Sequence, residues 1–359
     1  MHMADALLSP AVGATFWAGT LGTIAYCSKK LKENPDEKLI PLMGVLGAFI
    51  FAAQMINFTI PGTGSSGHLG GGMILAIILG PYAAFIVMAS VMMVQAFFFA
   101  DGGLLALGCN IWNLGIYPCF IAYPLIYKTL VGTESTPKRI TIAAAISGIV
   151  ALQLGAFSVV IETMLSGRSE LPFSTFVLMM QPVHLAIGLV EGFVTAGVIN
   201  FVRAARPEIL QSVTTARPLS AEVSIRKVIA GLLVVALLTG GILSWFASAN
   251  PDGLEWSIER VFGRSELPEQ KNGIAPALKK IQENTAFLPD YNFKTGENKA
   301  GGQESGKSEK PWPSAKAGTS VSGILGSAMV ISLIFLIGFG IRIVRKNKTT
   351  HKMTNNDIR

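Results

Sequence analysis

The sequence predicts an all-α membrane protein: a bundle of about seven helices, followed by a two-helix accessory module with a large external loop. Of its 359 residues, 50% are hydrophobic and only 14% are charged, and the mean hydropathy is +0.50. A soluble domain carries roughly 25% charged residues, so the deficit indicates a chain surrounded mostly by lipid. Most apolar runs reach the ~20 residues that a helix needs to cross a bilayer. These runs are 11–27, 40–58, 73–99, 104–127, 139–165, 177–202, 228–248 and 321–344.

Basic residues stand in blocks beside the ends of these runs, at 29–38, 203–227 and 342–348. Positively charged loops favour the cytoplasmic side of a membrane. We therefore expect a multi-pass protein of a bacterial inner (cell) membrane, with its N-terminus outside and its C-terminus in the cytoplasm. The net charge of +7 does not indicate a nucleic-acid partner, because the basic blocks lack the interleaved aromatic residues that stack on bases.

The stretch 73–127 is expected to cross the membrane an odd number of times, because the basic loop at 128–139 also has a cytoplasmic character. It contains only two obvious apolar runs. We therefore expect three short helices, with breaks near Pro81 and at Asp101-Gly102-Gly103. This interpretation gives seven helices up to residue 202 and nine in the chain, and a re-entrant run is the alternative.

A change of composition after residue 202 predicts two modules in one chain. The expected parts are the bundle 1–202, a cytoplasmic linker 203–226, a helix–loop–helix module 227–347 with the external loop 249–320, and a cytoplasmic tail 348–359. Within the loop, Lys299 to Gly318 lacks apolar residues to bury and is predicted to be disordered. We find no nucleotide-binding motif and no catalytic constellation. The chain is therefore not expected to be an enzyme, and any ATP hydrolysis must come from a partner.

The opening Met1-His2-Met3 predicts a chelating site for a transition metal. The bulky His2 hinders removal of Met1, so the mature chain is expected to keep a free α-amine there. That amine, the backbone nitrogen of His2 and Nδ1 of its imidazole can close two adjacent chelate rings, leaving one in-plane position. A planar nitrogen site suits Ni(II) or Cu(II), with Co(II) also accepted. Binding depends on pH, because the donors must shed protons.

His68 is the predicted fourth donor. It lies in the glycine-rich segment 62–72, on the same outer side as Met1 in the expected topology. Glycines allow tight backbone turns beside a ligand. A histidine in such a loop is usually an ordinary loop residue, but its pairing with His2 at one membrane face favours the ligand role.

His184 and Glu191 lie two helical turns apart, and therefore on one side of the predicted helix 177–202. Ionisable residues inside a membrane are costly and are often functional. Two interpretations remain open: a packed structural pair, or a role in metal transit or coupling.

Ala14, Ala18 and Gly22 follow one another at a spacing of four in the first run. Small residues at this spacing let another helix approach closely in lipid. They form either a partner-docking face or an internal packing face.

The Met1-His2 start, with Leu7-Leu8-Ser9-Pro10 after an acidic residue, resembles the CbiM/NikM permeases, the substrate-binding components of energy-coupling factor transporters for cobalt and nickel. The segments 65–68 and 184–191 are also similar to this family, and the resemblance covers residues 1 to about 202. The second module resembles the accessory subunit CbiN or NikN, because Asn250 to Trp256 contains its Pro-Asp-Gly-Leu-Glu signature. The chain is therefore similar to a natural fusion of the two.

The resemblance implies that the amine of Met1, two nitrogens of His2 and the imidazole of His68 hold the metal. It implies two partners, a membrane coupling protein (T-component) and an ATP-binding-cassette ATPase. It also implies that the accessory loop helps the metal to load, with Asn250, Asp252 and Glu255 contacting the outer mouth near His2. No permanently bound cofactor is expected, only transported Ni²⁺ or Co²⁺.

The leading interpretation is ATP-driven nickel uptake, in which this chain captures the ion. Planar nitrogen donors and the one-chain fusion favour nickel over cobalt. Cobalt uptake for cobalamin supply, a secondary transporter or channel that works without ATP, and, more distantly, a membrane enzyme of cofactor synthesis are the alternatives. The fusion to an accessory-like module argues against a transporter that works without partners.

Overall fold

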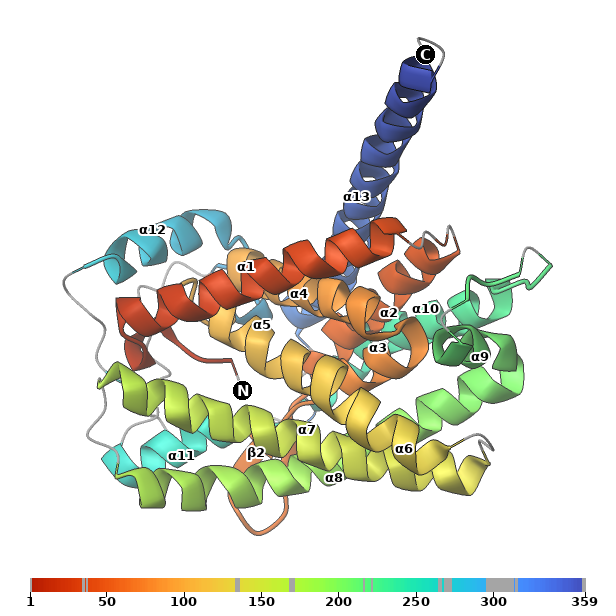
Figure 1. The fold of residues 1–359 in the computed structure, drawn as a ribbon. Coiled ribbons are helices and arrows are strands. Elements are labelled where there is room, and N and C mark those ends of the chain that lie inside the picture. The colour runs from red at the N-terminus through yellow and green to blue at the C-terminus, as the bar shows by residue number, and fades with distance from the viewer. Residues whose placement is uncertain are drawn as a thin grey trace.

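The computed structural model describes residues 2–33, 36, 38–132, 136–167, 172–215, 217–220, 222–263, 267, 273–294, 313 and 316–356. In the described part of the chain, the short 3₁₀ turn η1 (Asp5–Leu7) and seven longer helical segments precede residue 206, in agreement with the predicted all-α membrane bundle (Figure 1). They are α1 (Pro10–Glu33), α2 (Leu39–Gln54), α3 (Gly72–Leu79), α4 (Pro81–Phe99), α5 (Leu107–Ile116) continued by the π-helical η2 (Tyr117–Tyr127) and α6 (Lys128–Val131), α7 (Pro137–Ser166) and α8 (Phe173–Ala205).

Among the described residues, five helical stretches are long and apolar enough to cross a membrane: Pro81–Phe99, Leu107–Val131, Pro137–Ser166, Phe173–Ala205 and Ala317–Ile343. Their outer faces carry large apolar side chains, and Leu165, Leu178 and Leu336 are 69%, 66% and 68% exposed. Extended apolar surface of this kind marks contact with lipid or with a partner rather than with water. The chain is therefore a multi-pass membrane protein.

The stretch between residues 72 and 131 holds the three expected helices, with breaks at both expected places. Pro81 begins α4, where a missing N–H is tolerated. The second break starts at Ala100, whose φ of 56° ends α4. With eight residues, α3 covers only ~12 Å. The irregular segment before it must therefore enter the bundle, and His68, Gly70 and Gly71 are accordingly buried.

Two apolar runs contain structure other than helix. The run 40–58 leads into a hairpin, in which β1 (Phe58–Ile60) pairs antiparallel with β2 (Ser65–Gly67). Gly62 and Gly64 make its turn at φ of 77° and 75°, a conformation that favours glycine. The run 228–248 contains α10 (Arg226–Gly241) and then the 3₁₀ turn η3 (Leu243–Phe246).

The accessory module packs on the bundle through α10 and α13 (Ala317–Asn356), which contact each other and α2. A Cβ on Gly323 would lie 2.4 Å from the carbonyl oxygen of Gly240, and one on Gly326 would meet the ring of Phe51. Glycine at these crossings permits close approach of helices in lipid. The external part holds α11 (Gly253–Phe262), α12 (Ala275–Thr285) and η4 (Pro289–Tyr291). Of the predicted disordered segment, residues 299–312, 314 and 315 lie outside the described residues, and α13 already begins at Ala317.

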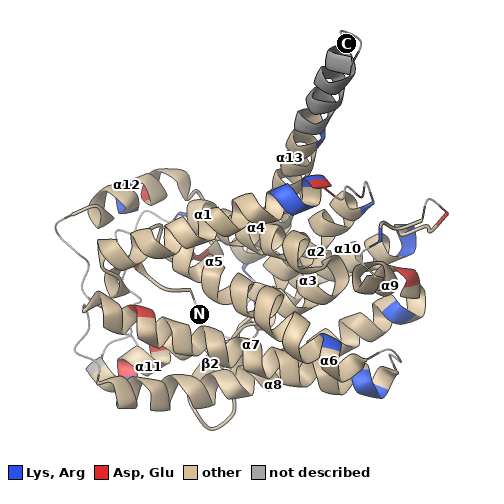
Figure 2. Cartoon of the chain, in the orientation of Figure 1, with Lys and Arg blue, Asp and Glu red and all other residues tan. Residues whose placement is uncertain are grey.

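Charge is distributed unevenly along the bundle. Figure 2 shows Lys and Arg gathered at the end where α6 and α9 (Pro207–Thr215) lie. The helices α11 and α12 lie at the opposite end (Figure 1).

The packing of α7 on α8 depends on glycine, and this gives a test of the fold. A Cβ at Gly192 would lie 2.4 Å from Cα of Ala145, whereas Gly197 on the same helix has nothing within 4 Å. Gly192→Leu is expected to force the helices apart at a cost of about 1–3 kcal/mol and to lower the midpoint of thermal unfolding in detergent. Gly197→Leu is the matched control and should leave the midpoint unchanged. Equal midpoints for both variants would contradict the packing.

Candidate metal site

The start of the chain is docked into the turn between α4 and α5. The Met3 N–H donates to Oδ1 of Asn110 (2.8 Å), and the Gly103 N–H donates to the Met3 carbonyl (3.0 Å). Asp5 accepts a hydrogen bond from the Ala106 N–H (3.0 Å). Met3 is fully buried. These bonds hold the segment after His2 in one place, so the position of His2 is set by the bundle.

The structure brings together two of the predicted ligands, His2 and His68. Their ring centres lie 4.9 Å apart and their planes differ by 22°. Two imidazoles on one ion have ring centres within about 6 Å of each other, because a metal–nitrogen bond is about 2 Å long. The pair can therefore reach one ion. Met1, the source of the predicted amine ligand, lies outside the described residues.

Burial affects the protonation of both imidazoles. It lowers the pKa of His2, against an opposing effect of Asp101, and it lowers the pKa of His68 well below its usual value. Both rings are therefore held in the neutral form, which is the form that binds a metal. Among the described residues, no three His, Cys, Asp or Glu side chains are grouped to hold a metal ion.

The segment that carries His68 is held by buried polar groups. Glu191 of α8 accepts hydrogen bonds from the N–H groups of Gly70 (2.7 Å) and Gly71 (3.1 Å). From the other side, Nε2 of Gln54 donates to the Gly70 carbonyl (2.8 Å). Nδ1 of His68 itself lies 3.0 Å from the Leu69 carbonyl. Glu191 thus fixes the main chain two residues after the imidazole.

The segment Asn250 to Trp256 covers the other side of the same loop. Ser66 donates its N–H to the Pro251 carbonyl (2.8 Å) and its hydroxyl to the Asn250 carbonyl (2.8 Å). Asp252 forms a parallel bridge with Ser66 and begins α11 in a capping box with Glu255. The three accessory residues singled out in the sequence therefore lie at or beside the loop of His68.

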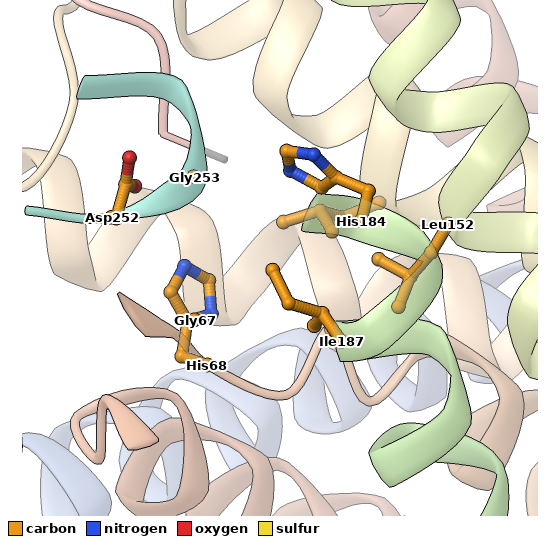
Figure 3. Close-up of a pocket in the computed structure, with 9 residues that line it drawn as sticks. Gly67, His68, Leu152, His184, Ile187, Asp252 and Gly253 are labelled. Atoms are coloured by element: carbon orange, nitrogen blue, oxygen red, sulfur yellow. The ribbon is translucent and has the colours of Figure 1, made fainter. Parts of the chain in front are cut away.

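A small cavity of about 10 Å³ lies between this segment and α8, lined among others by His68, His184 and Asp252 (Figure 3). It has room for about one water molecule. Nδ1 of His184 is hydrogen-bonded to the Met180 carbonyl (2.8 Å). Its Nε2 lies toward Gly253, where a Cβ would come within 3.5 Å. His184 therefore forms an inner wall behind His68, and Glu191 lies beyond it on the same helix.

A larger open cavity of about 860 Å³ leads to His2 and His68 from the other side. Its lining comes from both modules. The charged lining residues are Asp5, Asp101, Asp252, Glu255, Glu283 and Asp290, with Lys279 and Lys280. An excess of carboxylates in a cleft raises the local concentration of cations. We refer to this cavity as the vestibule.

The sequence analysis missed several residues of this site. Asp101 was used only as a helix break, yet its Oδ1 lies 3.4 Å from Nδ1 of His2. Gln54 and Gln95 are buried and joined by a hydrogen bond (2.9 Å) behind the His68 loop, and Asn110 holds Met3. The sequence did carry a signal for these residues. Polar side chains within apolar runs are costly to bury in a membrane and are therefore often functional.

The small residues of α1 do not belong to this site. Ala14, Ala18 and Gly22 are all exposed, and Gly22 has nothing within 4 Å. The other face of α1 packs inward, with Gly19 against Trp112. An internal packing role within the described structure is therefore excluded, and partner docking remains a proposal.

Two protein families match the chain. The family described as the cobalt uptake substrate-specific transmembrane region (CbiM) matches residues 2–209. The PDGLE domain matches residues 226–343. The two matches follow the division into bundle and accessory module.

Similar proteins include a putative fused nickel transport protein NikMN of Archaeoglobus fulgidus, 32% identical over 94% of this chain and 98% of that protein. The fused nickel transport protein NikMN of Rhodobacter capsulatus is 28% identical, over 81% of this chain and 88% of that protein. A crystal structure of a truncated transition metal transporter is 30% identical in sequence, with a TM-score of 0.51. The match covers 57% of this chain and 99% of the chain in that structure.

The role of Glu191 can be tested directly. Glu191→Ala leaves two buried N–H groups without an acceptor, at about 1–3 kcal/mol each, and should displace His68. We expect the affinity for Ni²⁺, measured by calorimetry on the purified chain, to fall at least ~10-fold. Glu191→Gln keeps one acceptor oxygen and should lose less. An affinity unaffected by Glu191→Ala would show that the loop does not need this carboxylate.

Proposed function

Since the chain belongs to the CbiM family and carries a PDGLE domain behind it, we propose that it captures Ni²⁺ outside the cell for ATP-driven import. It is the substrate-binding permease of an energy-coupling factor transporter in a bacterial inner membrane. A T-component and an ATP-binding-cassette ATPase are its partners and supply the energy. The chain itself carries out no bond chemistry.

The observation that carries the proposal is the pair of buried imidazoles at the inner end of an acidic vestibule. His2 supplies its backbone nitrogen and Nδ1, Met1 supplies its amine, and His68 supplies the fourth nitrogen. The 4.9 Å between the two rings supports a shared ion. Neutral imidazoles at a planar site favour a late transition metal over Mg²⁺ or Ca²⁺, which prefer oxygen ligands.

Nickel is preferred over cobalt for two reasons. Four nitrogen donors in a plane suit Ni(II) by geometry. Relatives that are named as fused proteins, as this chain combines two modules, are named as nickel transport proteins. Cobalt uptake by the same mechanism is the second candidate, because the description of the matching family names cobalt uptake.

The orientation follows from the distribution of charge. Basic loops favour the cytoplasmic side, so the α6–α9 end faces the cytoplasm and the vestibule faces outward (Figure 2). The ion enters through the vestibule and meets His2 and His68. His184, on the inner wall of the small cavity, acts in transit or coupling together with Glu191. The exposed Ala14, Ala18 and Gly22 offer a docking face to a partner helix.

The N-terminal amine can be tested by extending the chain. In cells that express the chain with its partners, a Gly-Ser extension before Met1 turns the amine into an amide and should abolish uptake of radioactive nickel. Cobalt uptake, measured in parallel, identifies the preferred ion. Equal nickel uptake by the native and extended chains would reject the N-terminal chelate. Metal flux through the chain alone in liposomes, as fast as through the complete complex, would instead favour a secondary transporter.

His68 and His184 should behave differently from each other. His68→Ala should weaken Ni²⁺ binding but leave a residual three-nitrogen site. His184→Ala should leave the affinity of the purified chain within about threefold, because His184 is not a ligand, while uptake in cells falls. Calorimetry and cell uptake together separate these outcomes. A loss of affinity on replacing His184 equal to that of His68 would assign both to the capture site.

A further inference from the structure

Two buried polar atoms beside the metal site have no hydrogen-bond partner among the described residues. They are Nε2 of His2 and Oε1 of Gln95, and the side chain of Gln95 is fully buried in α4. Buried polar atoms are nearly always paired, so each exception calls for an explanation. The two side chains are neighbours, because burial lowers the pKa of His2 and the Gln95 side chain is among the groups that raise it.

The orientation of the Gln95 amide is set by its other neighbours. Nε2 of Gln54 donates to the Gly70 carbonyl (2.8 Å), which can only accept, so Oε1 of Gln54 is left to accept from another donor. Nε2 of Gln95 donates to that oxygen (2.9 Å). The Gly70 carbonyl thus fixes both amides, and Gln95 is left with an acceptor, its Oε1, that still needs a donor.

Tyr291 of η4 does not supply that donor. Its hydroxyl, which also interacts with the Gln95 side chain, donates a hydrogen bond to Oδ2 of Asp101. A tyrosine hydroxyl has one hydrogen to donate. The Tyr291 hydroxyl therefore satisfies Asp101 and leaves Oε1 of Gln95 open to the imidazole of His2.

The position of the hydrogen on the His2 ring explains why the two atoms stay apart. Nδ1 lies 3.4 Å from Oδ1 of Asp101, and a neutral imidazole carries its one hydrogen on the nitrogen that faces an acceptor. With that hydrogen on Nδ1, Nε2 is itself an acceptor and cannot bond to the oxygen of Gln95. An ion bound at Nδ1 displaces Asp101, and the hydrogen of the neutral ring then resides on Nε2. Nε2 thereby becomes the donor that Gln95 lacks.

We propose that Gln95 is a positioning residue for metal capture, which accepts a hydrogen bond from Nε2 of His2 when the ion binds at Nδ1. The inference rests on the proposed function of His2 as a ligand. A ligand histidine commonly donates its other ring N–H to a neighbouring acceptor, which fixes the ring and makes the coordinating nitrogen more basic. Gln95 leaves Nδ1 accessible to the ion, whereas Asp101 faces this nitrogen and has to give way.

The same chain of hydrogen bonds reaches the second histidine. Gln95 is joined through Gln54 to the carbonyl of Gly70, two residues after His68 in the chain. The bond from His2 to Gln95 therefore ties the chain start to the segment of His68 through two buried amides. Donors that are held in place lose less freedom on binding, which raises the affinity.

The test uses the full chain with its native Met1, purified in detergent and titrated with Ni²⁺ by calorimetry. Gln95→Met keeps the length of the side chain but has no acceptor oxygen, and should weaken binding at least ~10-fold. Gln153→Met is the matched control. Gln153 of α7 also makes an amide hydrogen bond between helices, to the Gln181 carbonyl (2.9 Å), and its loss should leave the affinity unchanged.

A spectroscopic measurement separates positioning from structural damage. Cu²⁺ suits the same planar nitrogen site. Pulsed electron paramagnetic resonance detects the remote nitrogen of a copper-bound imidazole, and the quadrupole coupling of this nitrogen changes with its hydrogen bond. In a His68→Ala background, His2 supplies the one imidazole of the proposed ligand set. Gln95→Met should then shift the coupling, and Gln153→Met should not.

The outcomes distinguish this inference from the proposed function. Native affinity and an unchanged coupling for Gln95→Met would overturn the inference, while Ni²⁺ binding by the native chain leaves the proposed function intact. A weaker affinity with an unchanged coupling would also overturn it, because Gln95 would then act on the structure alone. Absence of Ni²⁺ binding by the native chain would overturn both.

Discussion

The hydrogen bonds from Gly70 and Gly71 to the Glu191 carboxylate are the interaction on which the rest of the site depends. A backbone that leaves regular structure inside a membrane must satisfy its polar groups within the protein. A buried carboxylate equally needs donors, because burial without them is costly. The carboxylate of Glu191 accepts from the two N–H groups, and these N–H groups are the donors that the buried carboxylate needs. The short α3 can then begin at Gly72 within the bundle, and His68 lines the vestibule.

The site is assembled from segments that are far apart in the chain, and the accessory module supplies one side of it. Its main chain pairs with Ser66, and its Tyr291 contacts Asp101. Neither contact persists if the module diffuses away. A covalent link keeps a second binding partner at a high effective concentration. Fusion of the two modules therefore stabilises the walls of the site without any additional contact.

The helices and two of the proposed metal ligands were predictable from sequence because their signals are local. Apolar length defines the spanning helices, Pro81 and the residues after Ala100 interrupt them, and Met1-His2 carries its own chelating geometry. The hairpin at 58–67 was not predictable, since its strands have three residues each and no alternation. Asp101 and Tyr291 were missed for a different reason. Their contact joins positions 190 residues apart, and only the packing of α12 on the end of α4 brings them together.

The composition of the vestibule and that of the chelate imply a division of labour in the proposed function. Carboxylates attract any cation, and they accept hard ions such as Ca²⁺ and Mg²⁺ as well as nickel. An acidic vestibule alone would therefore concentrate the wrong ions as well. Nitrogen donors supply the preference for nickel, and burial keeps both imidazoles neutral and ready to bind. Attraction and selection thus reside in different residues, and the two meet at Asp101, which lines the vestibule and lies beside His2.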